Sequence, residues 1–208
     1  VFVQPDRVSH MFWRGLDESH PLHAASSELA RGAIPWIYAE SDRVLGEVRK
    51  RLRPEDRLIV LSDHGFASFR RSVHLNRWLV DHGYLVMKAG ADATQPLFAA
   101  VDWSQTRAYA LGLNGVYINR QGREPEGIVN ATDADALEQQ LVTELGELRD
   151  PANQQAMVRK VYRATSIYTD SHRQDSPDLI VGYEPGYRAS WQTSLGATPT
   201  ELVEERAV

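Results

Sequence analysis

The sequence predicts an α/β fold in which helices flank a mainly parallel sheet. Two mainly apolar runs, residues 57–61 and 178–183, lack polar alternation and lie between turn-forming residues, as is typical of strands buried on both faces. One long segment with helical periodicity separates the first run from another apolar stretch at residues 1–4. A helix of that length between two strands suits a right-handed crossover, which joins parallel strands.

The composition is that of a soluble globular protein. The chain has 208 residues, 42% apolar and 25% charged, and this length favours one domain over two. A net charge of −5 argues against a nucleic acid polymer as a partner. This piece contains no run of about 18 apolar residues and no charged leader, so no membrane segment is expected. The sequence leaves the oligomeric state unknown and does not define the compartment, although it favours a cytoplasmic location.

The first element is a strand end at residues 1–4, which Pro5 interrupts. Asp6 and His10 follow at a spacing of four. If the segment between them turns helically, this spacing places both side chains on one face, where they can reach the same ion. Residues 12–23 are polar and aromatic and are expected to form an exposed loop, although their carboxylates and histidines are alternative ligands or substrate contacts.

A long amphipathic helix is expected between residues 24 and 54. Pro35 suits a first helical turn, and Pro54 helps to end the segment. Charged residues lie between the apolar positions and are expected to face solvent. The apolar positions, spaced largely by three and four residues, are Ile34, Ile37, Tyr38, Val44, Leu45, Val48 and Leu52.

The strand at residues 57–61 leads to Asp63 and His64. Ligands of open α/β sheets sit at the carboxyl ends of the strands, where an Asp–His pair is well placed to hold a metal. Gly65 lets the backbone turn immediately after the pair. In a plainer interpretation, Asp63 caps a following helix and His64 is an ordinary histidine. Because the first strand end carries a similar pair, we expect both pairs to form one site at the same edge of the sheet.

Short elements follow this motif. Arg70 and Arg71 lie in a polar loop, where they either bind phosphate oxygens or are simply solvated. Residues 75–81 are expected to form a short helix that ends with a glycine cap at Gly83. Residues 84–87 are a strand candidate.

The remaining segments predict a hairpin, a helix and a further strand. Residues 107–111 and 115–119 are two β-like runs joined by a glycine-containing turn, which predicts a small antiparallel hairpin. Thr132 or Asp133 is expected to cap a helix that runs to Leu145. The apolar stretch 157–162 fits either a strand or a helix. The strand at 178–183 comes next, and the tail from 187 to 208 shows no sustained periodicity.

The pairs Asp6–His10 and Asp63–His64 predict a metal site. There are no cysteines, so any metal ligands must be His and carboxylate side chains. Mixed oxygen and nitrogen ligands suit zinc or manganese better than calcium or magnesium. Two ions roughly 3.5–4 Å apart can stabilise both the attacking and the leaving oxygen in a displacement at phosphorus. The reaction class that this favours is phosphoryl-type hydrolysis.

Two motifs carry a resemblance to a known family. Ser62-Asp63-His64-Gly65, together with Asp6-x-x-x-His10, resembles the alkaline phosphatase superfamily. The longer stretches Gln4-Pro5-Asp6-Arg7 and His10-Met11-Phe12-Trp13-Arg14 are similar to its type I phosphodiesterase/nucleotide pyrophosphatase branch. The Asp-His-Gly tripeptide is shared by phosphodiesterases, sulfatases and cofactor-independent phosphoglycerate mutases, so it indicates the superfamily and not the substrate.

The resemblance implies an alkaline phosphatase-like fold with two divalent metal ions, with zinc preferred to manganese. Asp6 and His10 would match the ligands of one ion, and Asp63 and His64 those of the other. The family also needs a serine or threonine nucleophile and an aspartate, which would lie upstream of residue 1, and a histidine that would lie beyond residue 208. Residues 1–208 are therefore expected to be an incomplete domain, an internal fragment of one metallo-phosphohydrolase catalytic domain that is inactive alone.

The expected function is metal-dependent hydrolysis of phosphate esters, with a small-molecule phosphate ester or a nucleotide as substrate. Two alternatives stay open. One is a phosphomutase or sulfatase of the same superfamily, and the other is a non-catalytic binding module that retains the fold. The nucleophile and its neighbours would distinguish them.

Overall fold

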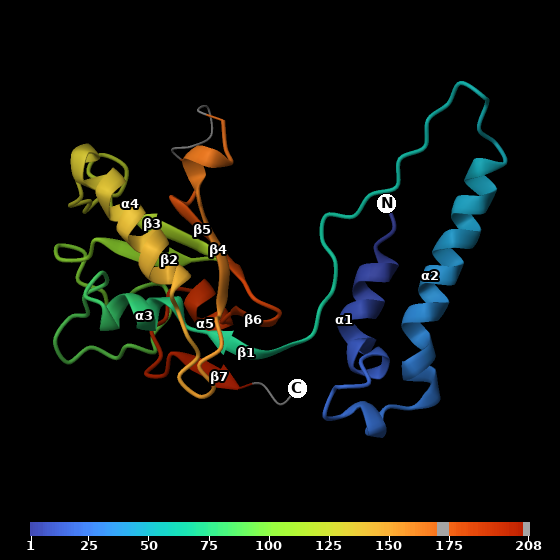
Figure 1. Cartoon of the computed structure of the whole chain (residues 1–208), viewed down its shortest axis with the longest axis horizontal. Coiled ribbons are helices and arrows are strands. Elements are labelled where there is room, and N and C mark those ends of the chain that lie inside the picture. The colour runs from blue at the N-terminus through green and yellow to red at the C-terminus, as the bar shows by residue number, and fades with distance from the viewer. Residues whose placement is uncertain (170–174, 206–208) are drawn as a thin grey trace. The chain divides into compact units, whose positions relative to one another are not determined.

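The computed structural model describes residues 1–169 and 175–205, which form two compact units (Figure 1). The first unit comprises residues 1–68, and its regular elements are helices. The second unit begins at Phe69 and contains all the strands found in the described residues. The last three residues of the predicted tail, 206–208, lie outside the described part, as do residues 170–174.

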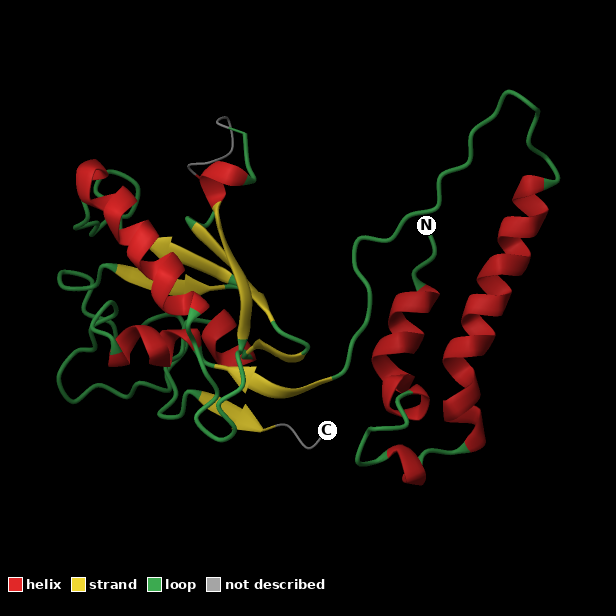
Figure 2. Cartoon of the chain, viewed as in Figure 1, coloured by secondary structure: helices red, strands yellow, loops and turns green. Residues whose placement is uncertain are grey.

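Two helices make up most of the first unit (Figure 2). The first, α1, spans Gln4–Leu16 and has Pro5 in its first turn, where a backbone N–H has no helical partner in any case. A short 3-10 turn, η1 (His23–Ala25), precedes the second helix, α2, which spans Glu28–Arg49. The Oγ atom of Ser27 accepts a hydrogen bond from the N–H of Ala30 at 3.2 Å and so caps α2.

Helices α1 and α2 lie side by side and approach each other closely at Gly15 (Figure 1). A Cβ atom at Gly15 would lie 2.7 Å from the carbonyl oxygen of Ala30, a distance that only glycine avoids. Ile34 and Ile37 of α2 are buried, as is Ser9 of α1. The small side chains of α1 thus set how closely its backbone packs against α2.

The two strands predicted in this unit are wrong. Residues 1–3 are coil before α1, and residues 57–61 are coil with exposed side chains, Ile59 at 78%. An extended segment becomes a strand only when another strand pairs with its backbone, and the described part of this unit contains no such partner. The predicted parallel crossover is therefore absent from the first unit. The helix between the two segments is confirmed, with Pro35 in its interior instead of its first turn.

A three-stranded sheet opens the second unit. Strand β1 (Phe69–Val73) lies between β6 (Gly186–Ala189), to which it is parallel, and β7 (Val203–Glu205), to which it is antiparallel. A one-turn helix, α5 (Trp191–Ser194), lies between β6 and β7 in the sequence. Two parts of the predicted tail, β6 and β7, are therefore regular because their backbones pair with β1, whereas residues 195–202 are turns and coil.

The second sheet has four strands in the order β2-β3-β5-β4, and every pair is antiparallel. Strands β2 (Ala108–Leu111) and β3 (Gly115–Ile118) form the predicted hairpin. Strand β4 spans Val158–Arg163, which settles the stretch left open between strand and helix, and β5 spans Leu179–Tyr183. The α/β class is confirmed, but a mainly parallel sheet is not. Among the described strands, β1 and β6 are the parallel pair. The parallel sheet was expected to include residues 57–61, which pair with none of the described strands.

The helices of the second unit begin and end close to the predicted residues. Helix α3 spans Leu75–Asp81 and is followed by Gly83, whose φ of +70° suits the predicted glycine cap. Helix α4 spans Ala131–Gly146, and a short 3-10 turn, η2, spans Ala164–Ser166. The strand predicted at residues 84–87 is wrong, because only Met87 makes a single bridge, to Val101.

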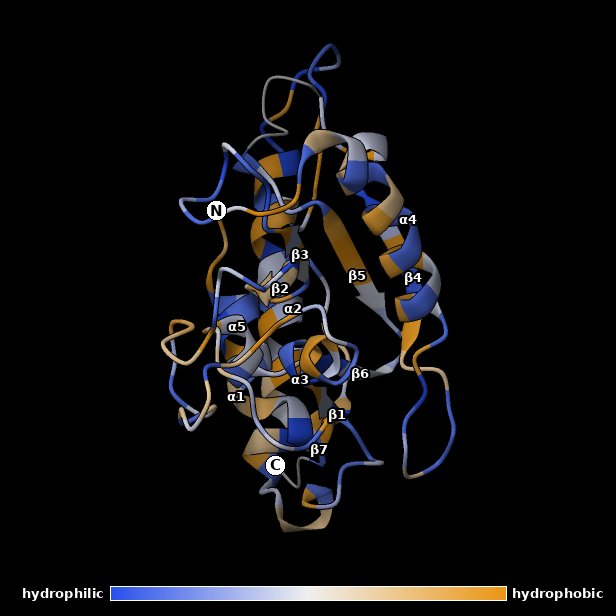
Figure 3. Ribbon diagram, turned by 90° about the vertical axis from the view of Figure 1, so that its left-hand side faces the viewer, coloured by the Kyte–Doolittle hydropathy of each residue, from blue (hydrophilic) through white to orange (hydrophobic). Residues whose placement is uncertain are grey.

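Part of the hydrophobic core of the second unit lies between α4 and the four-stranded sheet, and the same core continues to β1 and α3. Leu141 and Leu145 of α4 and Leu179 and Val181 of β5 have no exposed surface. Figure 3 shows this pattern, with mostly hydrophobic colouring on β5 and alternating colours along α4. One apolar stripe of α4 therefore packs on the sheet while its polar face meets the solvent.

Candidate metal centre

Helix α1 places Asp6 and His10 on one face. The two residues lie four positions apart within the helix, so their side chains project in nearly the same direction. The Nε2 atom of His10 lies 3.5 Å from the Oδ1 atom of Asp6. The condition for their proximity, a helical turn between them, is met.

His64 approaches the same carboxylate from the coil that precedes β1, and Asp63 lies beside His64. The Nε2 atom of His64 lies 3.6 Å from Oδ1 of Asp6 and 3.9 Å from Oδ2 of Asp63. Because both distances start at one nitrogen, the two carboxylate oxygens are no farther apart than the sum of these distances. That limit is below the roughly 8 Å expected for the ligands of two ions about 4 Å apart. The structure thus brings all four predicted side chains together within the first unit.

The Oδ1 atom of Asp6 is the centre of this cluster. It is buried and accepts no hydrogen bond from the described residues, although the imidazoles of His10 and His64 face it. A buried carboxylate oxygen without a donor is unfavourable. The 3.5 Å between this oxygen and Nε2 of His10 exceeds the length of an ordinary hydrogen bond, but it is near the roughly 3.4 Å between two ligand atoms on a tetrahedral zinc ion. The chemistry of this pair therefore fits a divalent ion that accepts both nitrogen and oxygen.

Local hydrogen bonds orient His64 for ligation. The Oγ atom of Ser62 donates to the carbonyl oxygen of His64 at 2.6 Å. The Nδ1 atom of His64 lies 3.1 Å from the carbonyl oxygen of Gly65. When Nδ1 donates its hydrogen to that carbonyl, the lone pair is left on Nε2, which faces Asp6. A carbonyl partner of this kind is usual for histidines that bind metal ions.

The cluster is open to solvent. The side chains of His10 and Asp63 are 67% and 90% exposed. In residues 1–169 and 175–205, no group of three or more His, Asp or Glu side chains is arranged to hold a single ion. An ion held by only two side chains would keep coordination positions for water, substrate or further groups.

Three residues that were not predicted as site residues form contacts between α1 and the segment 62–68, which contains Asp63 and His64. The ring of Phe66 stacks on that of Trp13 with centroids 5.5 Å apart, and it lies edge-on to the ring of His10 at 4.8 Å. The Nε1–H of Trp13 donates to Oγ of Ser68 at 2.8 Å. In the sequence, His64, Phe66 and Ser68 are alternate residues, a spacing that puts side chains on one side of an extended chain, but it does not identify α1 as the partner.

Other candidate contacts have structural partners. The guanidinium of Arg71 pairs with the buried carboxylate of Asp150, so the phosphate-binding interpretation of this arginine is not supported. In the loop expected to be exposed at residues 12–23, His20 is buried, and its Nδ1 atom accepts the N–H of Leu22 at 3.0 Å. The exposed-loop prediction is therefore wrong at His20, and it is also wrong at residues 12–16, which belong to helix α1.

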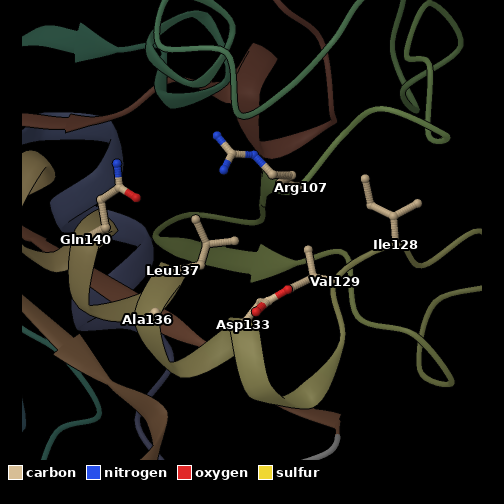
Figure 4. Close-up of a pocket in the computed structure, with 7 residues that line it drawn as sticks. All are labelled: Arg107, Ile128, Val129, Asp133, Ala136, Leu137 and Gln140. Atoms are coloured by element: carbon tan, nitrogen blue, oxygen red, sulfur yellow. The ribbon is translucent and has the colours of Figure 1, made fainter.

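The second unit contains a pocket of about 310 Å³ beside α4. Its walls carry a guanidinium, a carboxylate and an amide among apolar side chains (Figure 4). A single carboxylate with no histidine does not make a metal site, so this pocket is distinct in chemistry from the cluster around Asp6. The lining residues are Arg107, Ile128, Val129, Asp133, Ala136, Leu137 and Gln140.

Comparison with known proteins gives one match. The family described as type I phosphodiesterase / nucleotide pyrophosphatase matches residues 1–201, which include both pairs of the cluster. No curated protein and no solved structure matches the chain. In the part of the chain that the structure describes, no helix is long and apolar enough to cross a membrane.

Proposed function

Because the chain belongs to the type I phosphodiesterase/nucleotide pyrophosphatase family, part of the alkaline phosphatase superfamily, we propose that it serves in metal-dependent hydrolysis of phosphate esters. The family acts on small-molecule phosphate esters or nucleotides and generally uses divalent metal ions. The proposed substrates for this chain are a nucleotide or another small phosphodiester.

The observation that carries this proposal is the approach of His10 and His64 to Oδ1 of Asp6, with the carboxylate of Asp63 beside His64. Asp6 and His10 bind one divalent ion, and Asp63 and His64 bind a second. Zinc is the preferred ion and manganese the second choice, because both accept imidazole nitrogen and carboxylate oxygen.

The side chains of this chain hold and orient the reacting groups. Two divalent ions held there would supply positive charge for the non-bridging phosphate oxygens and would activate the attacking hydroxyl. His64 keeps its Nε2 lone pair available as long as Nδ1 donates to the carbonyl of Gly65. In the family the attacking group is a serine or threonine. We place that residue, and a further histidine ligand, outside residues 1–208.

Metal binding by the chain tests the ligand assignment without requiring turnover. Co²⁺ can replace Zn²⁺ and gives an absorption spectrum that reports nitrogen and oxygen ligands. We expect the wild-type chain to bind Co²⁺ and to release it to Zn²⁺, and D6N and H64A to bind at least tenfold more weakly. The matched control is D42N, which changes an exposed carboxylate on α2. Equal Co²⁺ affinity in D6N, H64A and D42N would show that the assigned ligands are wrong.

Turnover is tested in the longer enzyme of which residues 1–208 are proposed to be a part, because that enzyme would contain the nucleophile. Bis(4-nitrophenyl) phosphate, 4-nitrophenyl phosphate and 4-nitrophenyl sulfate are compared before and after chelation of the metal. Preferential, chelator-sensitive hydrolysis of the diester supports the proposal. Preference for the sulfate ester would indicate a sulfatase, and metal binding without any turnover would indicate a binding module.

A further inference from the structure

One face of α1 carries a regular stripe of side chains. Asp6, His10, Trp13 and Asp17 follow each other at spacings of four, three and four residues, the last of them at the C-cap. This is the spacing of residues that lie one above another on a helix surface. The two candidate metal ligands at one end are therefore continuous with an aromatic and a carboxylate side chain at the other.

Alternate residues of the segment 62–68 contact this stripe in order. His64 meets Asp6 at 3.6 Å, as described above. Phe66 comes next and packs against His10 and Trp13, with ring centroids 4.8 and 5.5 Å away.

Ser68 ends the row. It accepts the hydrogen bond from Trp13 at 2.8 Å and donates its own hydroxyl hydrogen to Oδ2 of Asp17. Asp17 is itself held, since its Oδ1 accepts the backbone N–H of Ser19 at 3.0 Å. The far end of the segment is thus tied to the end of α1 through two consecutive hydrogen bonds.

The two rows have matching lengths. Four residues of extended chain, from His64 to Ser68, cover about 13 Å. From Asp6 to the level between Trp13 and Asp17, α1 rises by about 14 Å. Each contact in the row therefore occurs without stretching the segment, and fixing Phe66 and Ser68 also fixes where His64 lies along α1.

His64 needs such an anchor. Its side chain is 54% exposed, and the residues that precede the motif, 57–61, are exposed coil. An exposed coil samples many backbone conformations, and ordering it costs conformational entropy. The contacts of Phe66 and Ser68 with α1, which follow His64 in the sequence, limit this motion.

We propose that Phe66 and Ser68 are positioning residues that anchor the segment 62–68 on the α1 stripe and thereby hold the imidazole of His64 against Asp6. The anchoring rests on contacts within the metal-free chain, and its effect on metal affinity rests on the proposed function. Phe66 acts through its ring, and Ser68 acts through its two hydrogen bonds. Neither residue touches the metal ion or the substrate.

The anchor is tested first without metal. The ring current of Phe66 shifts the resonances of protons on the two neighbouring imidazoles, so the carbon-bound protons of His10 and His64 are followed by NMR in the full chain with EDTA. We expect F66A to lose these shifts and F66Y to keep them. The matched control is F12A, which removes a half-buried ring of α1 outside the stripe. Unchanged histidine resonances in F66A would overturn the proposal whether or not the chain binds metal.

Metal affinity then tests the consequence. We expect F66A to bind Co²⁺ about tenfold more weakly than the wild type, with F66Y close to wild type and F12A unaffected. W13F keeps a ring against Phe66 but removes the donor to Ser68, so W13F and S68A should weaken binding to a similar, smaller extent. Thermal unfolding in EDTA shows whether each variant is folded. If the wild type binds and F66A binds equally well, the positioning role fails while the proposed function stands. If the wild type does not bind, the proposed function fails and the NMR result alone decides the anchor.

Discussion

Asp150 shows how a buried carboxylate is kept ionised in the second unit. Its side chain has no exposed surface. Burial acts to raise the pKa of Asp150, but hydrogen bonds from the N–H of Ala152, the hydroxyl of Tyr187 and the guanidinium of Arg71 outweigh it and hold this pKa below its ordinary value. The charge is therefore part of the fold and not of the candidate metal centre, which lies in the other unit.

Replacing Asp150 is expected to destabilise the protein in a pH-dependent way. Because its pKa is lower in the folded than in the unfolded state, its contribution is complete above the unfolded pKa of about 3.9 and is lost as the pH falls through the folded value. D150N should lower the free energy of unfolding at pH 7 by about 3 kcal/mol, since it removes the buried charge partner of Arg71 and leaves its guanidinium only the exposed carboxylate of Glu205, at 3.7 Å.

Urea unfolding at pH 7 and at a series of values below pH 4 measures both effects. The control is E147Q, which changes an exposed carboxylate after α4. The wild type and E147Q should lose stability steeply below pH 4, and D150N should lose less. Parallel pH profiles for all three proteins would contradict the assigned role.

Among the elements, helix α4 shows how a helix start is misjudged from sequence. Thr132 or Asp133 was predicted as the cap, but the N-cap is Asn130, whose Oδ1 accepts the N–H of Asp133 at 2.9 Å. Asn, Thr and Asp all favour the N-cap position, so residue type alone allowed the helix to begin after any of several residues. With the start at Ala131, Ala134 lies inside α4 and belongs to the same buried core as Leu137.

The cap position is directly testable. N130A removes the hydrogen-bond acceptor for the first turn of α4 and should reduce the free energy of unfolding by about 1 kcal/mol. T132A changes an exposed residue inside the helix and should alter it by less than about 0.5 kcal/mol. Both variants are compared by chemical denaturation under the same conditions. A larger loss in T132A than in N130A would place the cap where the sequence predicted it.

The same apolar pattern led to different structures in two segments. Residues 57–61 and β5 have similar runs of branched apolar residues, and both were predicted as buried strands. β5 forms because β3 and β4 pair with its two edges. Residues 57–61 have no pairing strand in the described part of their unit. A local pattern predicts the tendency of a segment to extend, whereas strand pairing depends on residues distant in sequence. The sequence therefore predicted more parallel strand pairing than the structure contains.

At the scale of the whole molecule, the candidate centre was easier to predict than the fold around it. The proximity of Asp6 and His10 follows from helical spacing. His64 was predicted as a candidate ligand of the same site from the Asp-His-Gly motif that this chain shares with the family. The anchor formed by Trp13, Phe66 and Ser68 is a contact between segments about fifty residues apart, and no local pattern specifies such a pairing. Sequence reasoning therefore identified the candidate ligands but not what holds them together.

Metal binding should stabilise the two units unequally. All four proposed ligands lie in the first unit, so an ion that binds only the folded site stabilises that unit. At a free Zn²⁺ concentration about 100 times the dissociation constant, this amounts to about 2.7 kcal/mol, or roughly a hundredfold slower amide exchange for openings that break the site. We expect this protection in α1 and in residues 62–68, measured by hydrogen exchange with mass spectrometry.

The second unit provides the internal control for this measurement. Amides of α4 and β5 should exchange at the same rate with and without Zn²⁺, because their core contains none of the proposed ligands. H64A should abolish the protection in the first unit while leaving exchange in β5 unchanged. Protection that appears equally in both units, or that persists in H64A, would mean that Zn²⁺ binds elsewhere, since a ligand can stabilise only the structure whose opening releases it.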